Sequence, residues 1–148
     1  MSRENIELMK AGYEAAARGD IASVLELMDP EVVLHDRPEA PDATTYHGLD
    51  GVLAALAVSA DEFEDFTFAP EQFFDAGDQV VVVLEMTGRG RTSGVPVEER
   101  IAHLWTLRDG RAVELRVFSD PADALESAGL PREGGADAYG TGQARRAR

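Results

Sequence analysis

The feature that most constrains the fold is a change in the spacing of apolar residues near Phe63. Before it, apolar residues recur every three or four positions, as in Ile6, Met9 and Tyr13, which is typical of amphipathic helices. After it, the chain contains long β-branched and alternating runs, such as residues 80–86. Helices first and strands later predict an α+β fold, in which N-terminal helices pack on one face of a curved antiparallel sheet.

Capping and turn residues set the expected boundaries of these elements. Gly19 ends the first helix, and Asp20 begins the second. Asp109-Gly110 predicts a tight hairpin, and Asp120-Pro121 begins the last helix. Pro70 interrupts a strand region that starts at residue 63. The expected helices cover 2–18, 21–28, 48–60 and 121–128, and the other expected strands cover 32–35, 80–86, 97–107 and 112–119.

Length and charge limit the classes of function. The 148 residues suffice for one domain, expected over 1–130, and the remaining 131–148 have so little to bury that we expect a disordered tail. The net charge of −14 opposes binding to nucleic-acid phosphates. The chain has no cysteine, which excludes disulfides and cysteine–metal sites. It has neither an apolar run that could span a membrane nor a secretory signal, so we expect a cytoplasmic protein with no membrane partner.

The segment V-V-L-H-D-R-P, residues 32–38, leads an apolar strand directly into a histidine and a carboxylate. Two interpretations fit this pattern. Asp36 either caps the proline-rich loop that follows, or it projects with His35 into a cavity and performs acid/base chemistry. In the second case the loop over 37–45 would shape the mouth of the cavity.

Four motifs follow one another along the chain: Y-E-A-A-A-R-G-D, D-P-E-V-V-L-H-D, Y-H-G-L-D-G and W-T-L-R-D-G-R. In this order the chain resembles the SnoaL-like branch of the nuclear transport factor 2-like superfamily, over about residues 4–129. The resemblance implies a cone-shaped sheet around a pocket, as in ketosteroid isomerase, polyketide cyclases, scytalone dehydratase and limonene-epoxide hydrolase. The superfamily also contains many non-catalytic members, so the fold does not give the function.

The resemblance to ketosteroid isomerase implies a catalytic role for Asp36, which matches a carboxylate that moves a proton. An apolar pocket disfavours the charged carboxylate and makes it a better base. The oxyanion-binding half of that site does not carry over, because Ala102 stands where a protonated aspartate is required and Tyr13 is one residue out of register. The arginine–aspartate pattern of the epoxide hydrolases fails as well, because Arg100 keeps the cation and Ala102 replaces the acid.

Alternation along residues 97–107 divides their side chains between two faces of the sheet. If Ala102 faces the cavity, Leu104 does as well, and His103 and Trp105 face outward. The resemblance places the dimer interface on the outer face. We therefore expect a homodimer that covers His103 and Trp105.

Two classes of function remain open. The first is a cofactor-independent acid/base enzyme, of isomerase, cyclase or hydrolase type, that acts on a small apolar molecule. The second is a non-catalytic ligand-binding or dimerisation module of the same fold. Arg116 bears on the choice, because it is either a pocket group or the partner of a buried acid such as Asp36 or Glu114.

The expected site needs neither a cofactor nor a metal. The three histidines fall on separate elements without the spacing of metal ligands. The expected catalytic residues are Asp36, His35, Tyr13 and Arg116, and the expected substrate-binding residues are His47, Tyr46, Ala102, Leu104, Phe66 and Met86.

Overall fold

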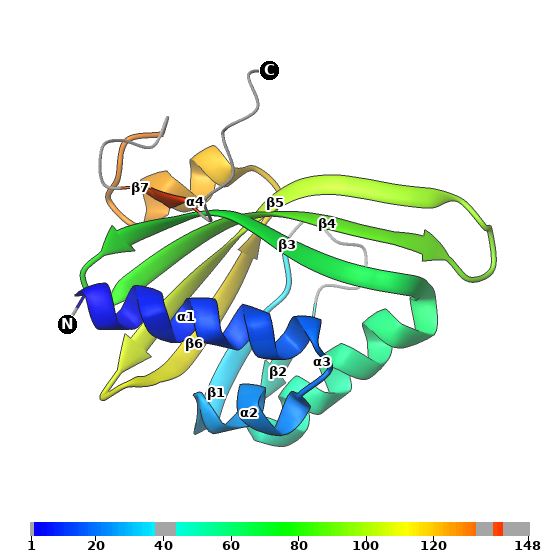
Figure 1. Ribbon diagram of the computed structural model, residues 1–148, viewed down its shortest axis with the longest axis horizontal. Coiled ribbons are helices and arrows are strands. Elements are labelled where there is room, and N and C mark those ends of the chain that lie inside the picture. The colour runs from blue at the N-terminus through cyan, green and yellow to red at the C-terminus, as the bar shows by residue number, and fades with distance from the viewer. Residues whose placement is uncertain (1, 38–43, 133–137, 141–148) are drawn as a thin grey trace.

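The computed structural model describes residues 2–37, 44–132 and 138–140, and Figure 1 shows their arrangement. The loop expected at the cavity mouth falls largely outside these residues. The helices are α1 (Ser2–Ala17), α2 (Ile21–Glu26), α3 (Gly48–Glu62) and α4 (Pro121–Ser127). The strands are β1 (Met28–His35), β2 (Thr45–His47), β3 (Phe63–Ala76), β4 (Gln79–Gly90), β5 (Pro96–Arg108), β6 (Arg111–Phe118) and β7 (Ala138–Gly140).

The strands form one sheet in the order β2-β1-β6-β5-β4-β3-β7. Each of the pairs is antiparallel apart from β1 and β6, which run parallel. The sheet is curved and open, with β2 and β7 at its edges, so it does not close into a barrel. The expected α+β class with a curved, mainly antiparallel sheet is confirmed.

Two apolar clusters pack on opposite faces of this sheet. In one, Ile6 and Met9 of α1 are buried together with Val82 and Leu84 of β4. Figure 1 shows α1, α2 and α3 grouped together, whereas α4 lies apart from them beside β7. The second cluster contains two residues of α4 and alternate residues of the central strands: Phe74, Val81, Val83, Ala102, Leu104, Ala124 and Leu125. The N-terminal helices therefore cover the concave face, and α4 covers the convex face.

The side chains of β5 face the opposite way from our expectation. Ala102 and Leu104 pack in the cluster under α4, and Ile101 and Trp105 belong to the cluster under α1. Strand alternation determines which residues share a face, but the covering layer determines which face is internal. His103 and Trp105 are buried inside the protein, at 4% and 6% exposure, so they cannot form the expected dimer interface on the outer face.

Local signals placed the hairpin and the helix starts correctly. Asp109 and Gly110 adopt positive φ values of 54° and 77°, as a tight hairpin turn requires. The carboxylates of Asp20 and Asp120 accept hydrogen bonds from backbone amides in the first turns of α2 and α4, those of Ser23 and Ala122. In contrast, β3 continues through Pro70, because the pairing with β4 shifts register directly after it and tolerates the missing donor.

Close contacts at both ends of α3 hold this helix over the concave face. Strand β2, in a segment expected to be a loop, leads directly into α3. A Cβ atom at Gly51 would lie 2.9 Å from the carbonyl carbon of Tyr46, so only glycine permits this close packing. At the other end, the Arg91 guanidinium donates to the carbonyl of Ala60 at 2.8 Å and satisfies a terminal carbonyl of the helix.

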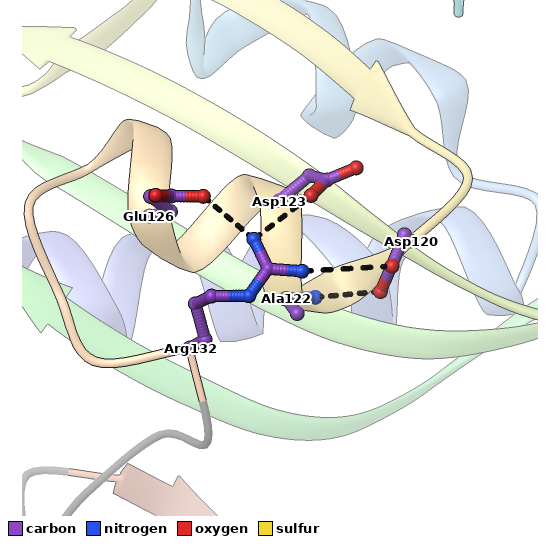
Figure 2. A network of polar contacts seen from close by, with 5 residues as sticks. All are labelled: Asp120, Ala122, Asp123, Glu126 and Arg132. Carbon is purple, nitrogen blue, oxygen red and sulfur yellow. Dashed lines mark hydrogen bonds and ion pairs between the residues drawn. The ribbon is translucent and has the colours of Figure 1, made fainter.

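The segment after α4 is clasped onto that helix by Arg132. Figure 2 shows its guanidinium among three carboxylates, with Nη1 bonded to Asp123 at 3.0 Å and Glu126 at 2.6 Å and with Nη2 4.0 Å from Asp120. Further on, β7 pairs with Gln72–Phe74 at the edge of β3. The expected tail over 131–148 thus includes a strand, and its residues 133–137 and 141–148 lie outside the described part.

Candidate ligand-binding and catalytic site

A cavity of about 660 Å³ lies between the concave face of the sheet and helices α1 and α3. Its volume is typical of small-molecule sites. The walls are mostly apolar, and Leu56 and Val58 of α3, which contribute to them, are 40% and 43% exposed. Apolar lining residues come from several strands and from α3: Leu34, Val52, Phe66, Met86, Ile101 and Leu115.

Three polar side chains from α1 and β5 form a hydrogen-bonded network in the wall of the cavity. The indole Nε1–H of Trp105 donates to the Tyr13 hydroxyl at 2.8 Å, and that hydroxyl lies 2.5 Å from Nδ1 of His103. Tyr13 and Trp105 are brought together although they are 92 residues apart in sequence. All three side chains line the cavity.

The donors in this network determine the tautomer of His103. An indole N–H can only donate, so the Tyr13 oxygen accepts from Trp105. We assign the Tyr13 proton to Nδ1 of His103, because the other tautomer would leave the hydroxyl proton without an acceptor among the described residues. The proton of the neutral imidazole then resides on Nε2. That Nε2–H makes no hydrogen bond to any residue in the described part of the chain.

Burial keeps the network uncharged. Desolvation, with a further contribution from the positive charge of Arg37, lowers the pKa of His103 to about 3. Burial also raises the pKa of Tyr13 well above its usual range. Near neutral pH the site therefore presents a neutral imidazole N–H inside an apolar cavity.

A second polar group lies on another part of the same cavity wall. Arg37 follows β1, and its Nη1 donates to Glu99 at 2.8 Å and to Ser119 at 3.1 Å. Glu99 is on β5, on the same face as His103, four residues before it. The cavity thus carries a neutral donor at His103 and an ion pair at Arg37 and Glu99.

The described residues contain no group of three or more histidine, aspartate or glutamate side chains that could hold a metal ion. None of the described helices combines the length and apolarity needed to cross a membrane.

Residues 9–115 match the family model of the SnoaL-like domain. The chain belongs to the SnoaL-like family. An uncharacterized protein of Mycobacterium tuberculosis is 30% identical over 127 residues, which cover 83% of this chain and 94% of that one. An NTF2-like protein from Burkholderia thailandensis superposes with a TM-score of 0.73 at 26% identity, covering 86% and 98%. TerC, co-crystallized with polyporic acid, gives a TM-score of 0.70 at 26% identity, covering 85% and 98%.

In this SnoaL-like protein, the expected catalytic carboxylate lies at the rim of the cavity. Asp36 contributes to the lining but is exposed, and its Oδ1 accepts a hydrogen bond from the backbone amide of Arg37 at 2.7 Å. His35 also borders the cavity, and it pairs with Glu114 at 2.9 Å, with its side chain 37% exposed. Both features favour a rim position over a desolvated one.

Arg116 does not line this cavity. It is exposed on the convex side of β6, where its guanidinium lies 5.2 Å from the ring centroid of Phe118 and donates weakly to Ser127 at 3.4 Å. Its hydrogen bond to a described residue therefore goes to neither of the acids we considered, Asp36 and Glu114. The residues of β6 that line the cavity are Leu115 and Val117, which alternate with it.

The expected substrate-binding residues divide into two groups. Tyr46, Phe66 and Met86 line the cavity. His47 instead precedes α3 as its N-cap and is exposed. Ala102 and Leu104 lie on the convex face under α4, for the reason given above.

Sequence reasoning did not assign four residues to the site: His103, Trp105, Arg37 and Glu99. The first two had been found but were assigned to the wrong face. Reversing the face assignment of β5 recovers both, and Tyr13 of α1 contacts His103 directly. Arg37 and Glu99 carried no local signal, since they are 62 residues apart.

Proposed function

We propose that this SnoaL-like protein binds a small, mostly apolar molecule that carries an oxygen acceptor, and that it performs acid/base chemistry on that molecule without a cofactor. The observation that supports this proposal is the neutral Nε2–H of His103, held by Tyr13 and Trp105 in the wall of an apolar cavity. A carbonyl or enol oxygen is the ligand group that completes such a donor.

The chemistry follows from the environment of this donor. A fixed N–H in a low-dielectric cavity stabilises negative charge that develops on a carbonyl oxygen more strongly than water does. A base at the rim would remove a proton from the carbon next to the carbonyl, and the electron pair would move to the oxygen. Asp36 is our candidate for this base. Return of the proton to another carbon completes an isomerisation. Attack of the enolate carbon on a second carbonyl of the same molecule, whose oxygen then takes up the proton, completes a cyclisation.

Tyr13 acts through His103 in this scheme. Its proton is committed to Nδ1, so it fixes the ring orientation and the tautomer and does not contact the ligand as a donor. The binding part of the proposal is supported by TerC, a protein of this fold that was co-crystallized with a small organic molecule, polyporic acid.

The second candidate is a binding module without turnover. The position of Asp36 favours it, because the carboxylate is exposed and bonded to the backbone of its neighbour. A carboxylate in water is a weak base for a carbon acid.

Hydrogen–deuterium exchange next to the carbonyl of a small cyclic ketone, such as tetralone, separates the two candidates. We expect the parent to accelerate exchange in D₂O, followed by proton NMR, and Asp36→Asn to lose about tenfold or more of this rate. Asp109→Asn is the matched control, because it makes the same change in a hairpin turn that tolerates asparagine.

The same samples report binding, because Trp105 is the single tryptophan of the chain and lies in the cavity wall. Ketone-induced changes in its fluorescence without exchange would favour the binding module. An unchanged spectrum with a broad panel of ketones and enols would contradict both candidates.

A further inference from the structure

Arg37 has hydrogen-bonding capacity that its protein partners do not use. A guanidinium has five N–H donors. Two of them, both on Nη1, reach Glu99 and Ser119. The three remaining N–H donors, one on Nε and two on Nη2, make no hydrogen bond with the described residues. The Nε and Nη2 atoms form the edge that binds both oxygens of a carboxylate.

Arg37 is also more buried than the other ion-paired arginines in the described part of the chain. Its side chain is 21% exposed, whereas four other ion-paired arginines are 48–61% exposed: Arg18, Arg91, Arg100 and Arg132. Burying a cation costs free energy that one ion pair recovers only in part. Since Arg37 lines the cavity, a ligand anion would supply the missing compensation.

Arg37 and His103 lie within electrostatic reach of each other, since the charge of Arg37 contributes to the lowered pKa of His103. The anchor of Arg37, Glu99, is four residues from His103 along β5, which is roughly 13 Å. An apolar body of one or two rings spans such a distance. One molecule can therefore place an acceptor oxygen at His103 and an acid group at Arg37.

We propose that Arg37 is the carboxylate-recognition residue of the cavity, so that the ligands are organic acids with an apolar body. This inference rests on the proposed function, because it assigns the substrate class of the same site. The overall charge of −14 does not attract such an acid, so the local cation must provide the selectivity.

The first test compares two ligands of equal shape. Binding of para-benzoylbenzoic acid and of para-benzoylbenzamide, which both carry a ketone oxygen for His103, is followed by Trp105 fluorescence near neutral pH. We expect the acid to bind about tenfold more tightly than the amide. Equal affinities would overturn the inference and leave the proposed function standing, whereas no binding of either compound would overturn both.

The second test assigns the preference to Arg37. In Arg37→Gln we expect the tenfold preference to fall below about twofold, with amide affinity unchanged. Arg108→Gln removes the same charge at the exposed end of β5 and should keep the preference. Survival of the preference in Arg37→Gln would overturn the inference.

A third variant separates recognition by Arg37 from repulsion by the unpaired Glu99 left behind. In the double variant Arg37→Gln/Glu99→Gln, direct recognition predicts that the preference stays absent, and its return would contradict the inference. If Arg37→Gln does not fold, Arg37→Lys replaces it, because lysine keeps the charge but lacks the two-donor edge; we expect it to lose most of the preference.

Discussion

Leu104 and Trp105 are neighbours in β5, but their side chains lie on opposite faces of the sheet and differ in how closely they are packed. Leu104 is 2% exposed in a closely packed cluster under α4 that includes the small residues Ala102 and Ala124. Trp105 is also buried, but it lies in the wall of a 660 Å³ cavity and uses its polar atom. The convex face thus supplies stability through close packing, and the concave face leaves apolar surface unfilled, as a ligand site requires.

The largest expected effect tests this contrast with one substitution on each side. Leu104→Ala should lower the free energy of unfolding by about 3 kcal/mol, because it leaves a void in a closed cluster. Leu56→Ala removes the same atoms from a half-exposed cavity residue and should cost less than about 1 kcal/mol. Urea unfolding of both variants gives the comparison, and equal losses would refute it.

The next effect is the acid sensitivity of the concave face. His103 has a pKa of about 3 in the folded protein and an ordinary value of 6.5, so only the unfolded chain binds a proton between these values. Stability is therefore fully present above pH 6.5 and falls as the pH drops, by about 1.4 kcal/mol per pH unit.

His103→Gln should remove this dependence, so the parent loses roughly 2 kcal/mol relative to it between pH 6.5 and 4.5. Urea unfolding across this range measures the difference. His47→Gln, at an exposed site, should retain the parent's pH dependence. Parallel curves for the parent and His103→Gln would show that His103 is not buried in its neutral form.

A smaller effect is expected from the hydroxyl that joins the network. Tyr13→Phe leaves the Trp105 N–H and Nδ1 of His103 without their shared partner and should cost about 2 kcal/mol. It should also change the fluorescence of Trp105. Tyr46→Phe, at another cavity residue, should change stability by less than about 0.5 kcal/mol. Equal losses in the two variants would contradict the network.

The smallest effect concerns the clasp on the convex face. Arg132→Gln removes ion pairs to exposed carboxylates, which contribute little to global stability. We expect faster amide hydrogen exchange in α4 alone, with exchange in α1 unchanged. Faster exchange across the whole sheet would mean that the clasp supports more than its own helix.

Local signals in the sequence determined the fold class and the order of the elements. The Asp109-Gly110 turn and the capping aspartates act within a few residues, so they specify their elements wherever the chain folds. The family motifs supported the cone-shaped fold in the same way. Three of the expected ligand contacts, Tyr46, Phe66 and Met86, also lie in the cavity wall.

Only the tertiary structure decided which residues meet there. Alternation in β5 grouped His103 with Trp105 and Ala102 with Leu104, but only the helices packed on each face determined that the first pair lines the cavity and that the second lies under α4. The contacts of Tyr13 with His103 and of Arg37 with Glu99 span 90 and 62 residues, and no local pattern encodes them. Side-chain periodicity is a property of one strand, whereas the inside of a protein is defined by what packs on each face.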